Sequence, residues 1–324
     1  MDTLILTRSE VADLLEPRSL LLALRLAFVA HSTDRNIEAM RIPVPLPAGE
    51  SVAGASGMLL APGLVAGIPA YSVKVHAKFP GQDPAIRGIL VLHDIATGAP
   101  LALIESSYLT ALRSALAGAL GAEVLSVPEA RTVAIIGAGA QGRSQLAALR
   151  LVRPIAVAHV FDTDAGTAHR FASDPGCSGL TVAVAASLEE ALDGADLIVT
   201  ATWASEPFIF KRHLRPGTHI TTLGPDEPGK CEVAADALKA ALVVVDDRRL
   251  AVEMGAIGGA CLGSDVIHAE LGEVLAGKRS GRTDATQITV FASVGVAFQD
   301  LAAGWLAYTL ARQHRIGRSV DLLG

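Results

Sequence analysis

The chain has few cysteines, no long basic run and no long apolar segment, and each shortage excludes a class of protein. Its three cysteines, Cys177, Cys231 and Cys261, are an odd number and form no C-x-x-C pair. This disfavours a disulfide framework and favours reduced thiols in a cytoplasmic protein. The formal net charge is −6. Without a basic patch or run, nucleic acid is not an expected partner.

No apolar run is long enough to suggest a membrane protein. Charged residues interrupt every apolar run before about 18 residues, the length of a transmembrane helix. The first residues, Met1, Asp2 and Thr3, lack the basic start of a signal peptide, so we expect none. Internal repeats and low-complexity segments are also missing from the sequence.

What the chain does have is the composition of a folded protein with a large core. Its 324 residues are enough for two domains or one large domain. Hydrophobic residues make up 51% and charged residues 19%. This balance excludes intrinsic disorder as the main state of the chain.

The N-terminal third contains helical and strand-like patterns in turn. Residues 8–31 have apolar residues at helical spacing, and Pro17 predicts a break between two helices. The short apolar runs that follow are bounded by Pro and Gly and predict an antiparallel or mixed sheet. These runs are 42–46, 58–61, 70–76, 88–93 and 101–105. Residues 107–126 are again predicted to be helical.

From about residue 131 to 290, predicted strands and helices alternate, which is typical of an α/β fold with a doubly wound parallel sheet. The predicted strands are 133–137, 157–161, 181–184, 197–200, 218–222 and 242–245. The predicted helices are 141–151, 165–172, 187–192 and 233–239. Residues 294–314 are helical too. Because the six-strand domain is then complete, we expect this last helix to pack on the N-terminal part.

A glycine-rich motif begins where the first of these strands ends. Gly137, Gly139 and Gly142 have the G-x-G-x-x-G spacing. The first glycine makes a tight turn, the second lets the backbone approach a pyrophosphate, and the third lets helix and strand pack closely. Amides at the start of the following helix then face an anion. The motif predicts a dinucleotide site that also includes Ala140, Gln141 and Arg143.

Asp162 lies twenty positions after Gly142, at the end of the apolar run 155–161. A carboxylate there accepts hydrogen bonds from both hydroxyls of the adenosine ribose and repels a 2′-phosphate. Residues 163–165 contain no arginine that would bind such a phosphate. The sequence therefore favours NAD over NADP, although NADP is possible. The alternative explanation of Asp162 is an ordinary solvated residue that opens the next turn.

Five segments, in this order along nearly the whole chain, resemble the ornithine cyclodeaminase/mu-crystallin family. They are S-V-K-V-H-A-K-F-P-G (72–81), L-T-A-L-R-S-A (109–115), I-I-G-A-G-A-Q-G-R (135–143), L-G-P-D-E-P-G-K (223–230) and S-V-G-V-A-F-Q-D (293–300). The resemblance implies a homodimer. It also implies a Rossmann domain, residues 120–296, inserted into an α+β dimerisation and substrate domain, residues 1–119 plus 297–324. The shared chemistry is hydride transfer between nicotinamide and the α-carbon of a small amino or imino acid.

The resemblance also assigns the residues that bind the substrate. Arg41, Lys74 and Arg113 match the family's carboxylate-binding positions, and cations of this kind suit an α-carboxylate. Lys74 lies in an otherwise apolar strand, where an unpaired lysine is costly. Lys78 shares one face of that strand with Lys74 and is expected to support the site, unless it is exposed beyond the strand end. His76 lies between them and either tunes the pocket or is a simple polar neighbour.

Without the resemblance, two of these residues have ordinary explanations. Lys74 is then equally well explained as an edge residue whose amine reaches water. Arg113 is explained as part of a solvated helix face, although its apolar neighbours disfavour this.

Asp226 matches the family's catalytic aspartate, and Lys230 follows it at the family's spacing. A carboxylate beside the α-nitrogen can hold an ammonium or iminium group and move its proton. The flanking prolines and Gly229 explain Asp226 equally well as a turn residue. The resemblance therefore implies that Asp226 or Lys74 supplies the proton.

The remaining assignments concern single positions near the expected coenzyme. Ser114 is expected to contact its phosphate or ribose. Thr200 and Thr202 end a strand at the carboxyl edge of the sheet, where cofactors bind. Val294 and Gly295 match the segment that approaches the nicotinamide. Capping or close packing is the alternative explanation for each, and no metal site is predicted.

One departure from the family pattern bears on the activity. Ornithine cyclodeaminases have a glutamate that handles the distal amine of the substrate, and Leu59 occupies its place here. We therefore expect an NAD(P)H-dependent imino-acid reductase, of the ketimine or pyrroline-carboxylate type, or an amino-acid dehydrogenase. One alternative is a cyclodeaminase that uses bound NAD catalytically and releases ammonia. Another is a non-enzymatic binding protein similar to mu-crystallin.

Overall fold

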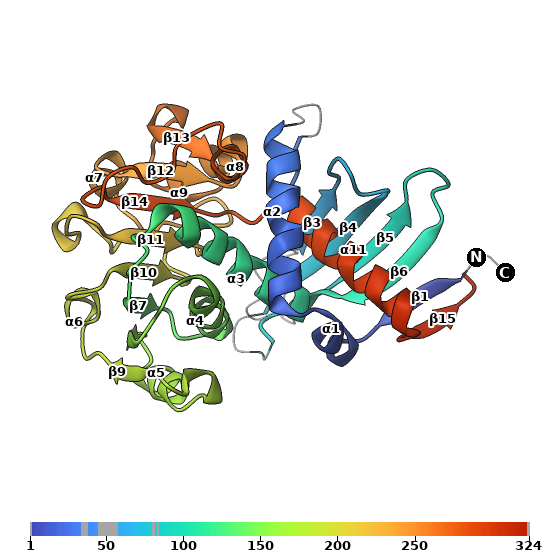
Figure 1. Ribbon diagram of the computed structural model, residues 1–324, viewed down its shortest axis with the longest axis horizontal. Coiled ribbons are helices and arrows are strands. Elements are labelled where there is room, and N and C mark those ends of the chain that lie inside the picture. The colour runs from blue at the N-terminus through green and yellow to red at the C-terminus, as the bar shows by residue number, and fades with distance from the viewer. Residues whose placement is uncertain (1, 34–37, 45–57, 80–81, 83, 323–324) are drawn as a thin grey trace. The chain divides into compact units, whose positions relative to one another are not determined.

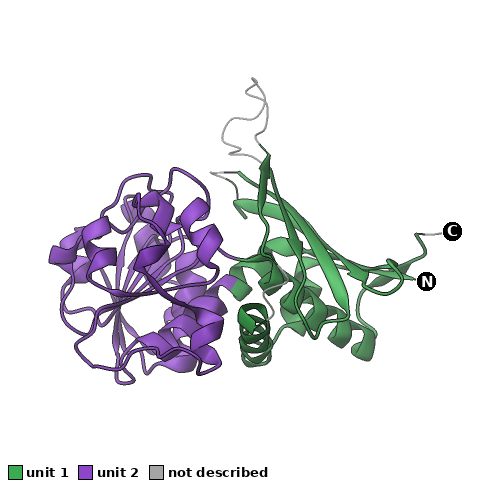
Figure 2. Cartoon of the chain, turned by 90° about the horizontal axis from the view of Figure 1, so that it is seen from above, with its two compact units in different colours: residues 1–113, 296–324 green, residues 114–295 purple. Residues whose placement is uncertain are grey.

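The computed structural model describes residues 2–33, 38–44, 58–79, 82 and 84–322. This described chain divides into two compact units, coloured separately in Figure 2. Unit 1 consists of residues 1–113 and 296–324, and unit 2 of residues 114–295. The first boundary falls inside helix α3 (Ser106–Leu125), so this helix contributes residues to both units.

Unit 1 is built on a mixed sheet whose described strands, seven in all, have the order β15-β1-β6-β5-β4-β3-β2 (Figure 1). The strands are β1 (Thr3–Leu6), β2 (Ile42–Val44), β3 (Met58–Gly63), β4 (Ala70–Lys78), β5 (Ile86–Asp94), β6 (Pro100–Glu105) and β15 (Arg318–Val320). β1 runs parallel to β6, and the other neighbours are antiparallel. The predicted mixed sheet is confirmed, although residues 45 and 46 of one predicted run lie outside the described residues.

The sequence did not predict β1 and β15. Each has only three or four residues, which is too few to show the alternation of a strand. They are held as strands by their neighbours: β1 pairs with β6 on one side and with β15 on the other.

Helix α11 (Ala297–His314) packs on one face of this sheet, which we call the inner face, and α2 (Pro17–Thr33) packs on α11. The edge of Phe28 meets the ring of Phe298 at a centroid distance of 5.1 Å. The predicted break at Pro17 is confirmed, because α1 (Arg8–Leu14) ends before it and α2 begins there. The expectation that the last helix packs on the N-terminal part is also confirmed.

In residues 114–295, all of which are described, eight parallel strands have the order β13-β12-β14-β11-β10-β7-β8-β9. They are β7 (Thr132–Ile136), β8 (Val157–Phe161), β9 (Thr181–Val184), β10 (Leu197–Thr200), β11 (His219–Thr222), β12 (Leu242–Val245), β13 (Ile267–Glu270) and β14 (Thr289–Ala292). The predicted doubly wound parallel sheet is confirmed. The expectation of six strands was wrong, since the four-residue strand β14 lies between β11 and β12 and the four-residue strand β13 adds an edge beyond β12.

Helices cover both faces of this second sheet (Figure 1). Val133 and Ile135 of β7 belong to a core with α3, α4 and α5, whereas Ala134 and Ile136 belong to a core with α6, α7, α8 and α9. The helices are α4 (Ala140–Val152), α5 (Ala165–Ala172), α6 (Leu188–Leu192), α7 (Ala235–Lys239), α8 (Arg248–Glu253), α9 (Ala256–Gly259) and α10 (Leu271–Leu275). Short 3-10 turns cover Pro175–Cys177, Lys211–His213 and Ser264–Val266.

The arrangement of unit 2 positions its loops. Because the strands are parallel, their carboxyl ends meet at one edge, and β7 and β10 adjoin at the point where the strand order reverses. Ligands of such sheets bind at this edge and near this point. Among the described residues, none of the helices is long and apolar enough to cross a lipid bilayer.

Candidate active site

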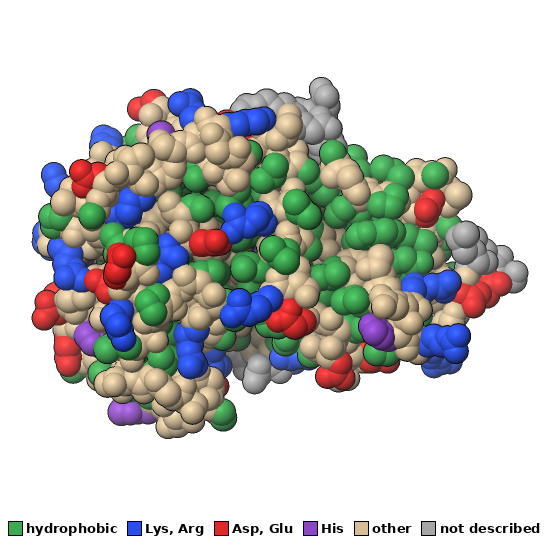
Figure 3. Space-filling model, viewed as in Figure 1, with side chains coloured by type: hydrophobic (Ala, Val, Ile, Leu, Met, Phe, Trp, Pro, Cys, Tyr) green, Lys and Arg blue, Asp and Glu red, His purple; other side chains and the backbone are tan. Residues whose placement is uncertain are grey.

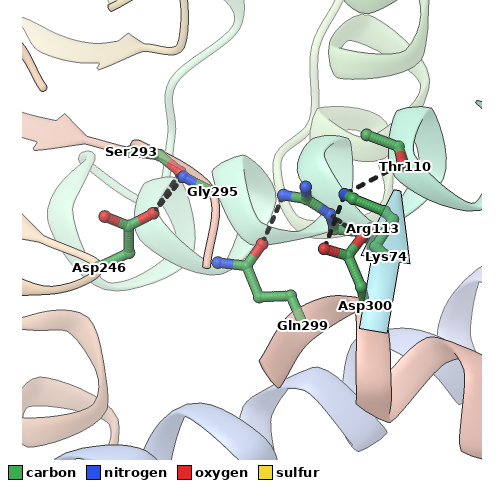
Figure 4. Close-up of polar contacts among 8 residues, drawn as sticks. All are labelled: Lys74, Thr110, Arg113, Asp246, Ser293, Gly295, Gln299 and Asp300. Carbon is green, nitrogen blue, oxygen red and sulfur yellow. Dashed lines mark hydrogen bonds and ion pairs between the residues drawn. The ribbon is translucent and has the colours of Figure 1, made fainter. Parts of the chain in front are cut away.

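In unit 1, Lys74 and Arg113 share one buried carboxylate, that of Asp300 (Figure 4). Lys74 Nζ lies 2.7 Å from Asp300 Oδ2, and Arg113 Nε lies 2.9 Å from Asp300 Oδ1. Lys74 and Asp300 each expose 1% of their surface, and Arg113 exposes 4%. These ion pairs supply the partner that a lysine in an apolar strand needs. They also exclude a water-exposed amine for Lys74 and a solvated helix face for Arg113.

The cluster joins the middle of β4, the interior of α3 and the first turn of α11. Lys74 Nζ also donates to Thr110 Oγ1 at 3.4 Å, and Arg113 Nη1 donates to Gln299 Oε1 at 2.8 Å. Asp300 lies in the first turn of α11, where the helix dipole favours a negative charge. Asp300 and Gln299 were not singled out from the sequence, although both belong to the S-V-G-V-A-F-Q-D segment.

The cluster shifts the pKa of Lys74 to about 7 from 10.5. Burial is the main cause, and the charges of Arg113 and Arg41 add to it, while Asp300 opposes it without cancelling it. Burial would raise the pKa of Asp300, but Arg113 and Lys74 outweigh burial and hold this pKa below its ordinary value. An amine that titrates near neutral pH can both donate and accept a proton there.

Residues of β4 alternate between buried and half-buried, which places Lys74, His76 and Lys78 together on the inner face. Lys78 exposes 6% of its surface, so its exposure beyond the strand end is excluded. Burial, followed by the charge of Lys74, lowers the pKa of His76 to about 3. The charges of Arg41 and Arg113 lower both the Lys74 and the His76 pKa, so these two arginines act on the same stretch of β4. Their binding of a substrate carboxylate stays a prediction.

The neighbouring strand β3 gives this site an apolar wall. Leu59 is the register partner of His76, and Ala61 is the register partner of Lys74. Leu59 therefore stands at the cationic stretch of β4, where a carboxylate would otherwise pair with an amine.

The glycine loop of unit 2 fits a dinucleotide, glycine by glycine. Gly137 has φ +99°, and an added Cβ would lie 2.5 Å from Ala201 O, so only glycine makes this turn. At Gly142 a Cβ would collide with Gly137 O, which keeps α4 close to β7. At Gly139 a Cβ would meet no described atom within 4 Å, so the backbone there is open to a pyrophosphate. Ala140 and Gln141 follow in the first turn of α4.

Asp162 lies beside this loop. Its Oδ2 accepts the Ala138 amide at 2.8 Å, and its Oδ1 accepts the Asp164 amide at 3.0 Å. These bonds fix the carboxylate at the end of β8 rather than leaving it as a loose solvated residue. Arg143 Nη1 donates to Ala138 O at 3.1 Å, so its side chain bends over the same loop. The contacts of Asp162 with ribose and of Arg143 with pyrophosphate stay predictions.

Thr200 and Thr202 bind a buried acid that was not predicted from the sequence. Their hydroxyls donate to the Glu232 carboxylate at 2.6 and 2.7 Å. The same carboxylate accepts bonds from the Thr202 amide, the Thr222 hydroxyl and the Gly224 amide, so five described donors meet it. Glu232 therefore joins the loops after β10 and β11 at the carboxyl edge of the sheet. The predicted contacts of Thr200 and Thr202 with coenzyme stay predictions.

Asp226 lies in the loop that Glu232 closes. Lys230 Nζ lies 2.9 Å from Asp226 Oδ1 and 2.8 Å from Glu227 Oε1, and it stands 4.6 Å from the centre of the Trp203 ring. Burial alone would lower the pKa of Lys230, but both carboxylates outweigh it and raise this pKa. Lys230 therefore orders the loop, and the catalytic role of Asp226 stays a prediction.

A second unpredicted acid orders the segment with Val294 and Gly295. Asp246, fully buried at the end of β12, accepts the Val294 amide at 3.1 Å, the Gly295 amide at 2.7 Å and the Ser293 hydroxyl at 2.9 Å (Figure 4). Burial raises its pKa.

Ser114 enters a further contact, since its carbonyl accepts Gln145 Nε2 at 3.0 Å. No group of acids, histidines and cysteines among the described residues suits a metal ion.

Known proteins match this chain along its length. The model of the ornithine cyclodeaminase/mu-crystallin family matches residues 1–315. Alanine dehydrogenase of Archaeoglobus fulgidus is 30% identical over 325 residues, which cover 99% of this chain and 98% of that protein. Ornithine cyclodeaminase of Agrobacterium tumefaciens is 36% identical over 225 residues, 68% of this chain and 62% of that protein.

A solved structure agrees with the fold. Thermococcus litoralis Δ1-pyrroline-2-carboxylate reductase, in complex with NADH and L-proline, superimposes with a TM-score of 0.90 at 30% identity. The superposition covers 98% of this chain and all of that chain (100%).

Proposed function

Since this chain belongs to the ornithine cyclodeaminase/mu-crystallin family, we propose that it is an oxidoreductase that reduces a small α-imino acid with a nicotinamide coenzyme. The reverse reaction oxidises the corresponding amino acid. The observation that carries the proposal is the buried cluster of Lys74, Asp300 and Arg113. Relatives named alanine dehydrogenase and Δ1-pyrroline-2-carboxylate reductase support this class of reaction.

The cluster has the charge that an α-carboxylate requires. Four charged groups act on Lys74 or His76. Three of them are positive, Arg41, Lys74 and Arg113, and one is negative, Asp300. A substrate carboxylate that enters it gains charge-assisted hydrogen bonds, and Arg113 can bind it in a fixed orientation. Asp300 holds Lys74 and Arg113 in place while the substrate is absent.

The reaction needs one hydride and one proton. When bound, the nicotinamide coenzyme supplies the hydride that forms the new C–H bond at the imino carbon. The C=N π electrons then move to the nitrogen, which takes the proton. Lys74 is the proposed proton donor, because its pKa of about 7 lets it give up a proton at neutral pH. Asp226, the other predicted donor, is the second candidate for this step.

We propose NAD(H) as the coenzyme. The open backbone at Gly139 and the ordered carboxylate of Asp162 support it, since the carboxylate suits two ribose hydroxyls and repels a 2′-phosphate. The pyrophosphate would lie over the first turn of α4, where backbone amides and Arg143 are placed to receive it.

We also propose that the chain acts as a homodimer. Val73 and Val75 of β4 face away from α11, and Ile89 of β5, the register partner of Val75, is 48% exposed on that outer face. Leu22 and Leu26 of α2 are 61% and 71% exposed. Figure 3 shows hydrophobic side chains on the face of the molecule that includes α2. Apolar surface of this kind favours burial against a second copy. A solved alanine dehydrogenase relative is a dimer, and light scattering should give twice the mass of the chain.

The proposed compartment is the cytoplasm. Cys177, Cys231 and Cys261 are free thiols, and thiols stay reduced where the cytoplasmic redox buffers act. Localisation of a tagged chain by cell fractionation tests this.

The test of the proposed function is coenzyme oxidation by the purified protein. NADH and NADPH are supplied separately with Δ1-pyrroline-2-carboxylate, with Δ1-piperideine-2-carboxylate, or with pyruvate and ammonium. We expect loss of the NADH absorbance with at least one of these imines. If every imine leaves both coenzymes unchanged, and L-threonine with NAD⁺ gives no NADH in the reverse direction, the proposal is overturned.

The second candidate is a cyclodeaminase, favoured by the 36% identity to an ornithine cyclodeaminase. Such an enzyme releases ammonia from ornithine or lysine with no net change in NADH. Leu59 opposes it, because the inner face of β3 has no carboxylate there for a distal amine.

A further inference from the structure

His76 is a buried polar group that the reaction described so far does not use. It exposes 6% of its surface and lies on the inner face of β4, two residues from Lys74. Its Nδ1 is buried and has no hydrogen-bond partner among the described residues. Buried polar atoms almost always have a partner, and leaving one without costs free energy. The imidazole is therefore placed for a partner that the described residues do not provide.

Other unpartnered polar atoms lie in the same unit around the same cluster. Gln299 is fully buried, and its Oε1 accepts Arg113 Nη1, which fixes the orientation of the amide. Its Nε2 is then left without a partner in the described chain, as is Oγ of Ser72, the next inward residue of β4 before Lys74. Unpartnered atoms from β4 and α11 thus accompany one ion-pair cluster. Such a grouping indicates a ligand site rather than scattered packing defects.

His76 acts in this site as a neutral hydrogen-bonding group. Burial is the main reason that its pKa falls to about 3, and the charges of Lys74, Arg41 and Arg113 lower it further, while Asp300 opposes them. A neutral imidazole has one donor and one acceptor. It can therefore bind a hydroxyl or carbonyl oxygen without adding a charge to the site.

The residues beside His76 leave this role to it. Its register partner on β3 is Leu59, which has no polar atom, and its register partner on β5 is Gly88, which has no side chain. An added Cβ at Gly88 would collide with the Val75 carbonyl oxygen and lie 2.5 Å from His76 Cβ, so the close approach of β5 to β4 requires glycine here. Of these three register partners, His76 is the one whose side chain can form a hydrogen bond.

We propose that His76 binds the side chain of the substrate and selects amino and imino acids that have a hydroxyl or carbonyl oxygen there. The inference rests on the proposed function, because it assumes that the α-carboxylate binds at Lys74 and Arg113. In this proposal, the oxygen of the substrate side chain is the hydrogen-bond partner that His76 Nδ1 lacks among the described residues. A substrate with an apolar side chain of the same shape leaves the imidazole unpaired and is disfavoured.

The experiment compares isosteric amino acids in the oxidative direction. L-Threonine and L-valine have the same shape and differ by a hydroxyl in place of a methyl group. With the wild-type protein and NAD⁺, we expect kcat/KM to be at least tenfold higher for threonine. In His76→Phe the ratio should fall to about one, mainly through KM. His76→Asn keeps a hydrogen-bonding group and should restore part of the preference.

A binding measurement separates this inference from the proposed function. Calorimetric titration of the wild-type protein and both variants with threonine and with valine, without coenzyme, reports recognition alone. If wild-type protein binds and oxidises both amino acids equally, the inference is overturned and the oxidoreductase is not. If no imine is reduced and threonine is not oxidised, but threonine binds tenfold more tightly than valine, the proposed function fails and recognition by His76 stands. If His76→Phe does not fold, judged by circular dichroism, the wild-type comparison and His76→Asn decide.

Discussion

Lys74 Nζ lies 2.7 Å from Asp300 Oδ2, although 226 residues separate the two in the chain. The residues between them include the whole of unit 2. Unit 1 is therefore completed only when α11 returns to β4. This explains why a buried lysine that looks isolated in the sequence is paired in the fold.

If Lys74 is the proton donor, as proposed, the reaction has a defined pH dependence, because burial lowers the pKa of this amine to about 7. We predict that Lys74→Met lowers kcat for imine reduction by about 10²- to 10⁴-fold, the usual contribution of a general acid. In the wild type, the pKa of about 7 means that the protonated donor disappears as pH rises through 7. The reduction rate should therefore fall above this pH, while amino-acid oxidation, which needs the neutral amine, should rise.

The measurement is kcat in both directions between pH 5 and pH 9, with the buried-lysine variant beside an exposed-lysine control, Lys239→Met. The control should keep both the rate and the profile. A wild-type rate that does not change across pH 7 in either direction would assign the proton to another group, with Asp226→Asn as the next variant.

Asp300→Asn should destabilise unit 1. Lys74 and Arg113 then stay buried without their carboxylate, and breaking a buried ion pair from one side costs about 3–5 kcal/mol. The pKa of Lys74 should fall further, because the charge that raises it is lost. Asp193→Asn, at an exposed position, is the matched control and should change the free energy of unfolding little. Urea unfolding of both variants gives the comparison.

The ion pairs of Asp300 with Lys74 and Arg113 also predict how the folding stability changes in acid. The pKa of Asp300 in the folded chain lies below its ordinary value of 3.8. Its contribution to stability is therefore present above that pH and is lost as pH falls towards the folded pKa. The stability difference between wild type and Asp300→Asn should shrink below about pH 4. A difference that is constant from pH 7 to pH 3 contradicts the ion-pair explanation.

Asp162→Ser should weaken the preference for NADH over NADPH. The change removes the carboxylate that repels a 2′-phosphate, and we expect the ratio of kcat/KM for the two coenzymes to shift at least tenfold towards NADPH. Asp164→Ser is the control, because Asp164 lies two residues away and caps α5 rather than the glycine loop. If both variants change the ratio equally, Asp162 does not select the coenzyme.

The sequence predicted what depends on local pattern and on a recognised motif. The strands β7–β12 could be predicted because apolar strand segments alternate with helical segments along the chain. The dinucleotide motif could be predicted from the spacing of Gly137, Gly139 and Gly142. Lys74 and Arg113 could be identified through the resemblance, and the cost of an unpaired lysine indicated that a partner exists. The partner itself could not be identified, because Asp300 reaches β4 only through tertiary packing of α11.

Glu232 and Asp246 escaped prediction for a related reason. Asp246 directly follows the apolar run 242–245 and Glu232 directly precedes the apolar run 233–235, and at such borders an exposed turn residue is the ordinary explanation. Their role appears only when parallel strands bring their hydrogen-bond donors to one edge, as when Thr200, Thr222 and Gly224 meet Glu232. A buried acid with only backbone and hydroxyl partners leaves no charge pattern in the sequence.

Leu59 predicts the limit of the substrate range. It stands opposite His76 on the inner face, and a leucine can neither bind nor deprotonate the distal amine of ornithine. The cations of β4 and α3 repel that amine as well, so ornithine should be a poor ligand. We therefore expect no release of ammonia or proline when the purified chain and NAD⁺ are incubated with L-ornithine, under conditions in which an imine is reduced.

In Leu59→Glu, ornithine binding should strengthen while the coenzyme affinity stays unchanged, since the substitution alters no residue of the glycine loop. Leu59→Gln, equal in size but uncharged, is the control. Ammonia release from ornithine by the wild type would contradict the prediction and establish the cyclodeaminase.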